Sequence, residues 1–313
     1  MRSRFGIFAC SLILFFSGSP ANSAATVPTT PRSFNIFVST KYSPTTPVPL
    51  IIALHGFNQS GAKFEKYLNL TPVAQADDII YVHPDGTADT HGVKFWNGTR
   101  ECCDFQSPKV DDDAYVMSII DSVSAQYAID PNRIYIIGHS NGGFMANRLA
   151  CDHADRIAAI VNMAGGSFTT ATACKPAAPI SVLEIWGTAD ETFKGNHILG
   201  KPIPGAAKTF NTWALINKCS KVSEVVPQKL DLDKQIPGTE TSMTQYLDCP
   251  SGTAIDFWKI DGARHVPVLS NNFAPDIVDW LLAHPRVIPS ITNQGSQGSS
   301  KDFLTADEQV SYR

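Results

Sequence analysis

Ser140, Asp190 and His265 have side chains that could together carry out nucleophilic catalysis. A serine hydroxyl is a poor nucleophile at neutral pH, so it needs a histidine to accept its proton and a carboxylate to orient that histidine. Ser140 lies at the centre of Gly138-His139-Ser140-Asn141-Gly142. The glycines two positions before and after the serine lack Cβ atoms, which permits a sharp turn with an exposed hydroxyl. The pattern indicates Ser140 as a candidate nucleophile.

The segments on either side of Ser140 predict how the turn is held. Residues 133–137 are an apolar run of β-branched and aromatic residues that predicts a buried strand, and residues 143–150 predict the start of a helix. Strand, tight turn and helix in this order form the nucleophile elbow of α/β-hydrolases. The pentapeptide alone is weak evidence, because roughly 0.1 chance matches are expected in a chain of this length. The flanking elements make the prediction specific.

Asp190 and His265 each follow a predicted strand directly. The strand before Asp190 is residues 180–186, and the strand before His265 is residues 254–260. In α/β-hydrolases the acid and the histidine follow the serine in this order, on loops at the carboxyl ends of strands, where ligands bind. We therefore expect Asp190 to orient His265, and His265 to act as the base for Ser140.

Two other residues could compete for these roles. Asp261 is a second carboxylate near His265, but it is too close to the histidine in sequence to suit the usual geometry. His139 precedes Ser140 inside the turn and cannot easily present its ring as the base. Neither residue therefore replaces the predicted acid or base.

An oxyanion hole needs two backbone N–H donors that point at the developing negative charge. We expect one from Asn141, directly after the nucleophile, and one from Phe57, in the turn after the predicted strand at residues 50–54. No cluster of His, Cys and Asp residues has metal-ligand spacing, so we expect no metal or other cofactor.

Strands and helices alternate along most of the chain, and several predicted strands are continuously apolar, which predicts an α/β fold with a mostly parallel sheet and helices on both faces. The region between Asp190 and Ala254 departs from this alternation. It contains a helix around residues 206–216, which includes Trp213, and then a small polar hairpin. We expect an insertion near the active site that forms one wall of an acyl or alcohol pocket, with Trp213 in its helix. The predicted strands are 34–38, 50–54, 79–82, 133–137, 157–161, 180–186 and 254–260, and further helices are expected at 112–127 and 274–283.

The N-terminus resembles a secretory signal peptide. Arg2 and Arg4 precede about a dozen apolar residues and a small-residue cleavage region. We expect a signal peptide at residues 1–24, a catalytic domain at 25–285 and a disordered polar tail at 286–313, which is too short to form an adsorption module. An uncleaved N-terminal anchor is the alternative. No other run reaches about 18 apolar residues, so we expect a secreted or periplasmic protein without a membrane span after cleavage.

Composition and cysteine count narrow the class further. The net charge is −4 and no long basic run occurs, so nucleic acid is not an expected partner. Of seven cysteines, six remain once Cys10 is removed with the signal peptide. Proximity favours Cys151 with Cys174 and Cys219 with Cys249. Cys102 and Cys103 are then left, and they could form a strained adjacent disulfide or remain free thiols.

Further motifs give the chain a specific family resemblance. They extend over roughly residues 34–283, and they resemble the polyhydroxybutyrate depolymerase/feruloyl esterase family of secreted α/β-hydrolases. The resemblance implies an ester hydrolase with Ser140, Asp190 and His265 as its triad. The motifs are Leu54-His55-Gly56-Phe57, Trp96-Asn97 followed by Cys102-Cys103, Val110-Asp111-Asp112-Asp113, Asp130-Pro131-Asn132-Arg133-Ile134-Tyr135, Gly138-His139-Ser140-Asn141-Gly142-Gly143, Trp186-Gly187-Thr188-Ala189-Asp190, Cys219, Cys249 and His265.

The chain departs from the family pattern beside the histidine. Members usually carry Trp-Pro after it, whereas here Val266-Pro267 follows His265. The missing aromatic residue disfavours an aryl or sugar-stacking substrate.

The sequence favours an exported serine esterase that acts on soluble short-chain or carbohydrate-linked esters, similar to feruloyl and acetyl esterases. Polyhydroxyalkanoate depolymerase activity, an exported serine peptidase with the same triad, and an inactive binding protein on a hydrolase scaffold are the alternatives. A peptidase would need an acidic anchor for a peptide amino terminus, and no clear one is present.

Overall fold

The structure is a computed structural model that describes residues 32, 34–105, 109–198 and 200–286. The predicted signal peptide and residues 287–313 of the predicted tail lie outside the described residues. Within the part that is described, no helix is both long and apolar enough to cross a membrane.

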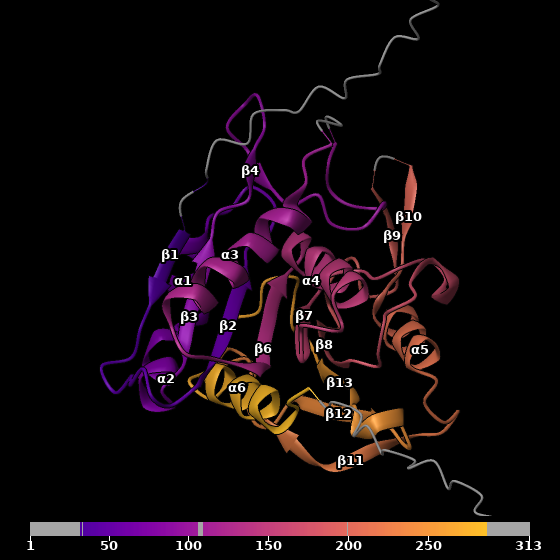
Figure 1. The fold of residues 1–313 in the computed structure, drawn as a ribbon. Coiled ribbons are helices and arrows are strands. Elements are labelled where there is room, and N and C mark those ends of the chain that lie inside the picture. The colour runs from indigo at the N-terminus through magenta and orange to yellow at the C-terminus, as the bar shows by residue number, and fades with distance from the viewer. Residues whose placement is uncertain (1–31, 33, 106–108, 199, 287–313) are drawn as a thin grey trace, which may run out of the picture. The chain divides into compact units, whose positions relative to one another are not determined.

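A nine-stranded sheet forms the centre of the fold (Figure 1). Strands β3, β2, β6, β7, β8 and β13 run parallel, while β1 adds antiparallel to β3 and the pair β12–β11 adds antiparallel to β13. The sheet order is β1 (Phe34–Phe37), β3 (Ile80–Pro84), β2 (Val48–Leu54), β6 (Ile129–His139), β7 (Ala159–Met163), β8 (Ser181–Gly187), β13 (Ile255–Ile260), β12 (Thr241–Tyr246) and β11 (Ser223–Leu230).

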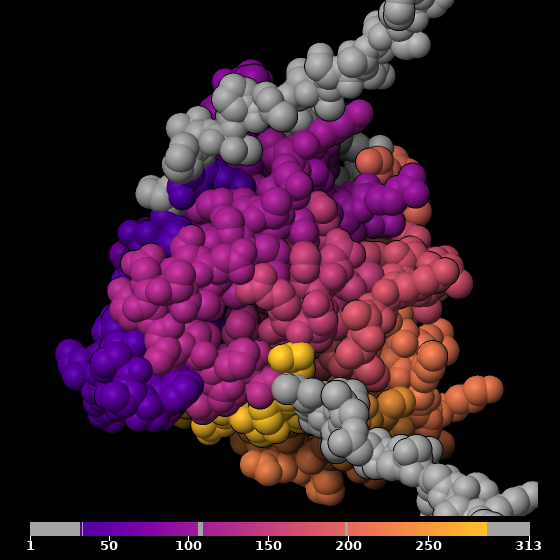
Figure 2. Space-filling model, in the orientation of Figure 1, coloured from indigo at the N-terminus to yellow at the C-terminus, as the bar shows by residue number. Residues whose placement is uncertain are grey.

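Helices cover both faces of this sheet, as the continuously apolar strands predict. Along β2, Leu50 and Ile52 pack in the core cluster that includes α3, α4 and α5, whereas Ile51 and Ala53 pack in the cluster that includes α1, α2 and α6. In Figure 2 the segment that carries α3 and α4 forms much of the surface on the viewer's side. The helices are α1 (Gly61–Leu68), α2 (Thr71–Ala76), α3 (Asp112–Gln126), α4 (Asn141–Asp152), α5 (Ala206–Asn217) and α6 (Phe273–Ala283), with short 3₁₀ turns η1 (Ala171–Ala173) and η2 (Pro250–Gly252).

Two short hairpins lie outside the central sheet. Strands β4 (Thr87–Ala88) and β5 (Lys94–Phe95) form one, and β9 (Asn196–Ile198) and β10 (Lys201–Ile203) form the other. The second hairpin belongs to the insertion expected between Asp190 and Ala254, and it brings residues of that insertion to the pocket described below.

The rest of the insertion differs from the expectation. The polar hairpin is present as β11 and β12, but it extends the edge of the central sheet through β13. Trp213 is fully buried, and its indole N–H bonds the side-chain oxygen of Asn147 in α4. The insertion therefore forms one wall of the pocket through residues such as Asn196 and Ile203, and Trp213 in its helix is not part of that wall. Burial of the large ring against α4 stabilises the helical layer.

The elbow strand also begins earlier than expected. Residues 130–133 form turn-like bonds around Asp130, whose carboxylate accepts from the Asn132 N–H and from the Arg133 side chain. The structure nevertheless includes them in β6, where the pairing shifts register between Val48 and Leu50 of β2. The turn is thus a bulge inside the strand.

Three disulfides stabilise the described region. Cys151 at the end of α4 pairs with Cys174, and Cys219 after α5 pairs with Cys249, as the spacing predicts. Cys102 and Cys103 are also joined to each other, across a cis peptide bond. The adjacent pair is thus a disulfide rather than two free thiols.

We expect each long-range disulfide to contribute measurably to stability. The two bridges close loops with sequence separations of 23 and 30 residues, for which the chain-entropy model gives about 3–4 kcal/mol each. The paired variants Cys151→Ala/Cys174→Ala and Cys219→Ala/Cys249→Ala should each lower the free energy of unfolding by this amount in denaturant titrations. Unfolding midpoints equal to that of the wild type would contradict the pairing.

Candidate active site

Ser140 lies in a strained turn between β6 and α4. Its backbone has φ 52° and ψ −116°, a conformation that non-glycine residues rarely adopt. A Cβ atom at Gly138 would collide with the Gly142 carbonyl, and one at Gly142 would collide with the Leu54 carbonyl at the end of β2. The two glycines are therefore required because strand, turn and helix approach one another closely, as the motif predicts.

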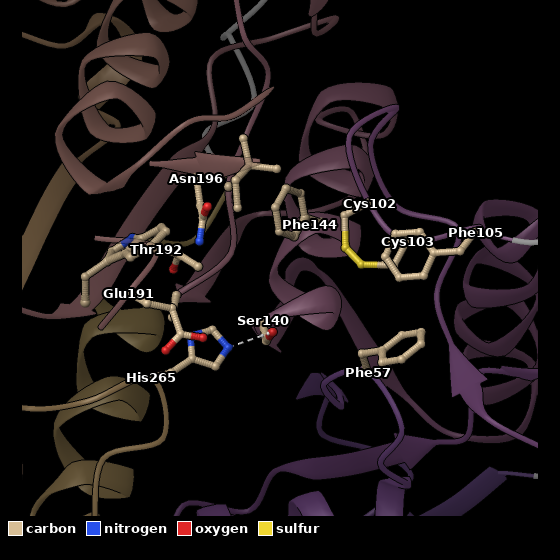
Figure 3. Close-up of a pocket in the computed structure, with 14 residues that line it drawn as sticks. Phe57, Cys102, Cys103, Phe105, Ser140, Phe144, Glu191, Thr192, Asn196 and His265 are labelled. Atoms are coloured by element: carbon tan, nitrogen blue, oxygen red, sulfur yellow. Dashed lines mark hydrogen bonds between the residues drawn. A yellow bond between two sulfur atoms is a disulfide. The ribbon is translucent and has the colours of Figure 1, made fainter. Parts of the chain in front are cut away.

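His265 bridges Ser140 and Asp190, and Figure 3 shows its bond to Ser140. Its Nε2 lies 2.9 Å from the Ser140 Oγ, and its Nδ1 lies 2.8 Å from the Asp190 Oδ2. An ionised carboxylate only accepts hydrogen bonds, so Nδ1–H donates to Asp190 and Nε2 is left to accept from the serine hydroxyl. The structure thus brings together the three residues that the sequence singles out, in the order needed for proton transfer.

Neighbouring groups set the protonation of this pair. Burial opposes a charged imidazole, but the hydrogen bond and charge of Asp190, with the charge of Glu191, outweigh it and raise the pKa of His265 above 6.5. Burial likewise opposes ionisation of Asp190. Hydrogen bonds from His265 and from the Thr192 N–H and hydroxyl nevertheless lower the pKa of Asp190. Asp190 therefore remains a carboxylate at neutral pH.

The competing carboxylate points elsewhere. Asp261 accepts a hydrogen bond from the Thr188 hydroxyl at 3.0 Å, and this hydroxyl also accepts from the Gly262 N–H. Asp261 therefore helps hold the end of β13 against the end of β8.

Three side chains hold the His265 loop from outside. The His139 Nε2 lies 2.9 Å from the His265 carbonyl oxygen, and the Tyr67 hydroxyl donates to the Pro267 carbonyl at 2.9 Å. Asp233 accepts from the Val268 N–H. Because a carbonyl only accepts, Nε2 of His139 carries the hydrogen. Burial lowers the pKa of His139 to about 4, so its ring is neutral at neutral pH.

The expected oxyanion donors lie beside the serine. Asn141 is the first residue of α4, where backbone N–H groups have no intrahelical acceptor. Phe57 lines the same pocket as Ser140, and a Cβ atom at Gly56 would lie 3.5 Å from the Ser140 Cβ. The Asn141 side chain pairs with both backbone groups of Trp96 at 2.7 and 2.8 Å, which fixes the start of α4 against the β5 segment.

The pocket over Ser140 measures about 250 Å³. Figure 3 shows its aromatic wall on one side of the serine and its polar wall on the other, beside His265. Aromatic rings thus reach the site from segments other than the one after His265, which removes the argument against aryl substrates. The lining residues include Phe57, Phe105, Phe144, Cys102, Cys103, Glu191, Thr192, Asn196 and Ile203.

The sequence does not predict a buried carboxyl group that is bonded to the pocket-lining residue Trp186. Glu184 in β8 is fully buried and accepts from the Asn162 side chain at 2.6 Å and from the Trp186 indole at 3.2 Å. Burial raises the pKa of Glu184 to about 8, although both hydrogen bonds oppose this. Asn162 also bonds both backbone groups of Gly165. The one feature of the sequence that could have indicated Glu184 is the presence of an acidic residue inside an apolar strand.

Metal-binding groups are not evident at this site. Across the part of the chain that the structure describes, no group of three or more His, Cys, Asp or Glu side chains is placed to hold a metal ion.

Solved structures show which fold this is. An acetyl xylan esterase from Aspergillus awamori matches with a TM-score of 0.54 and 12% identity over 79% of this chain and 93% of its own. A thermostable esterase matches with a TM-score of 0.52 and 14% identity over 81% and 59%. The protein has the α/β-hydrolase fold, with the mainly parallel sheet that the sequence predicts.

Sequence comparison gives the family. The model of the Esterase PHB depolymerase family matches residues 35–186. Feruloyl esterase B of Piromyces equi is 30% identical over 227 residues, which are 69% of this chain and 39% of that protein. Poly(3-hydroxyalkanoate) depolymerase C of Paucimonas lemoignei is 26% identical over 53% of this chain and 40% of its own. The chain belongs to the esterase family that contains polyhydroxybutyrate depolymerases and feruloyl esterases.

The matches cover only part of the relatives and only part of the proposed site. The chain spans about two fifths of the length of these two relatives. The family match covers Phe57, Ser140 and Asn141 but ends before Asp190 and His265. The proposed roles of those two residues therefore depend on the hydrogen bonds described above.

We expect the pH dependence of kcat/KM to reflect the pKa of His265, which Asp190 raises. The base must be neutral, and its pKa is raised, so kcat/KM should fall on the acid side with an inflection above pH 6.5. Asp190→Asn removes the main groups that raise this pKa. It should move the inflection to lower pH and reduce kcat by roughly 10³- to 10⁴-fold. Asp261→Asn is the matched control and should leave the inflection in place. A wild-type inflection below pH 6 would contradict this assignment.

His139 should act by positioning His265. His139→Phe keeps a ring against Phe64 and Tyr67 but removes the hydrogen bond to the His265 carbonyl. Loss of one buried hydrogen bond should lower kcat about five- to tenfold, with little change in KM. The acid inflection should move as well, because the imidazole is then less well aligned with Asp190. Wild-type kcat and an unchanged pH profile would show that His139 has no such role.

Proposed function

We propose that this protein is a serine carboxylic-ester hydrolase that acts through an acyl-enzyme. The observation that carries the proposal is the pair of hydrogen bonds by which His265 joins the Ser140 Oγ to the Asp190 carboxylate. Membership of an esterase family supports the same reaction.

In the first half of the reaction, the Ser140 Oγ attacks the ester carbonyl carbon while His265 Nε2 takes the hydroxyl proton. The backbone N–H groups of Phe57 and Asn141 stabilise the negative charge on the carbonyl oxygen. His265 then gives its proton to the departing alcohol oxygen, and the acyl group remains on Ser140.

In the second half, water replaces the alcohol. His265 takes a proton from the water molecule while the water oxygen attacks the acyl carbon. The proton then returns to the Ser140 Oγ as the acid leaves. Asp190 keeps the imidazole oriented and stabilises its charged form throughout.

We propose soluble short-chain or carbohydrate-linked esters as the substrates. The pocket of about 250 Å³ lies near the small end of ligand sites, which run from about 300 to 1,000 Å³. Relatives named feruloyl esterase and bifunctional acetylxylan esterase/xylanase support this class. Polyhydroxyalkanoate depolymerisation is the second candidate, favoured by the family match and by the depolymerase relative.

Export is also part of the proposal. Disulfides persist in oxidising compartments, and the described residues contain three of them. The N-terminal pattern of charge, apolar run and small residues agrees with a secreted or periplasmic location.

Ser140→Ala should abolish hydrolysis without unfolding the protein. The expected loss is at least about 10⁴-fold in kcat, measured on esters from p-nitrophenyl acetate to methyl ferulate, with an unchanged circular dichroism spectrum as the control. A fluorophosphonate probe should label the wild type and spare the variant. Residual turnover of more than a few per cent would rule out Ser140 as nucleophile, and no labelling of the wild type would favour an inactive binding protein.

Assays of the purified wild-type protein on polymer and peptide substrates separate the candidate functions. We expect slow clearing of a crystalline polyhydroxybutyrate suspension relative to soluble esters. Clearing at a comparable rate would favour the depolymerase. Cleavage of peptide amides without ester preference would favour the peptidase.

A further inference from the structure

The two walls of the pocket differ in chemistry. On the side away from His265 the pocket is lined by Phe57, Phe105 and the Cys102–Cys103 disulfide (Figure 3). On the side of His265 its polar lining residues are Glu191, Thr192 and Asn196, and the apolar Ile203, which pairs with Asn196 in the β9–β10 hairpin, lies among them. The serine lies between the walls, so the two halves of an ester bound there meet different surroundings.

Acyl transfer decides which half of the ester meets which wall. The departing alcohol oxygen must receive its proton from His265 Nε2, so it must lie beside the imidazole. The alcohol half is therefore directed toward the polar wall, and the acyl half toward the aromatic wall. This placement of the alcohol and acyl halves rests on the proposed function.

Glu191 gives the polar wall a negative charge. It is exposed, and among the described residues that line the pocket it is the only carboxylate. The ion pairs found among the described residues do not include Glu191. Its charge also acts on the reacting groups, because it helps raise the pKa of His265. An alcohol that carries its own negative charge would therefore meet repulsion where it has to bind.

We infer that Glu191 is a specificity-determining residue that selects the alcohol half of the ester by charge. Neutral hydroxyl-bearing alcohols are accepted, and alcohols that carry a carboxylate are disfavoured. The Thr192 hydroxyl donates to Asp190, so its oxygen can still accept from a neutral, hydroxylated group, and the Asn196 amide offers a further hydrogen bond. A hydroxy acid with a free carboxylate is the kind of leaving group that this wall rejects.

A matched pair of esters isolates this effect. 4-(Butyryloxy)butanoate and 4-(butyryloxy)butanamide share the same acyl group and differ only in a carboxylate against a neutral amide. Butyrate release gives kcat/KM for each, at low ionic strength and on the alkaline plateau where His265 is neutral in every variant. Wild type should prefer the amide about fivefold, as for two like charges a few ångströms apart in water, and added salt should reduce this preference.

Glu191→Gln should abolish the preference by raising kcat/KM for the carboxylate ester relative to kcat/KM for the amide ester. Glu224→Gln is the matched control, because it makes the same charge change at an exposed site on β11 that does not line the pocket. It should retain the wild-type ratio.

The outcomes separate the inference from the proposed function. Equal kcat/KM for the two esters in wild type, or an unchanged ratio in Glu191→Gln, would overturn the inference while ester hydrolysis stands. A ratio abolished equally by Glu224→Gln would also overturn it, because net charge would then be the cause. No butyrate release from either ester or from p-nitrophenyl butyrate would overturn the proposed function itself.

Discussion

The close approach of backbone to backbone around Ser140 is the constraint on which the rest of the site depends. The chain must leave a buried parallel strand, turn within one residue of positive φ and enter a helix. This is possible only where the neighbouring positions lack side chains, as at Gly138 and Gly142. In return, the serine hydroxyl is raised above the sheet edge and the first N–H groups of α4 lie beside it. The tight turn therefore provides the position for both the proposed nucleophile and part of the proposed oxyanion hole.

The partners of the serine come from distant parts of the sequence, and sheet topology brings them together. Strands β8 and β13 are parallel neighbours, so the loops that follow them begin at the same edge. Asp190 and His265 are 75 residues apart but within hydrogen-bonding distance. The bonds from His139, Tyr67 and Asp233 then restrict the histidine loop, so alignment does not depend on the Asp190 bond alone.

The local parts of this design could be predicted from sequence, and the non-local parts could not. The elbow, the acid–histidine order and the apolar strands each depend on residues adjacent in the chain or on the order of elements. Trp213 shows the limit, because an aromatic residue in an insertion near the site can equally be buried, and only α4 decides this. Tyr67 carries no local pattern, and the only local signal of Glu184 is that it is an acidic residue inside an apolar strand. Their functions depend on contacts with Pro267 and Asn162, which are far away in sequence.

Glu184 and His265 place opposite demands on pH. The Glu184 carboxyl has a folded-state pKa of about 8, raised from 4.5, so the folded chain holds a proton that the unfolded chain releases. The stabilisation linked to this proton is complete below about pH 4.5 and declines as pH rises toward 8. His265 works in the other direction, because it accepts a proton only when neutral, above its raised pKa. Acid conditions therefore favour the folded state through Glu184, whereas alkaline conditions favour turnover by the proposed base, so the usable pH range is a compromise between stability and activity.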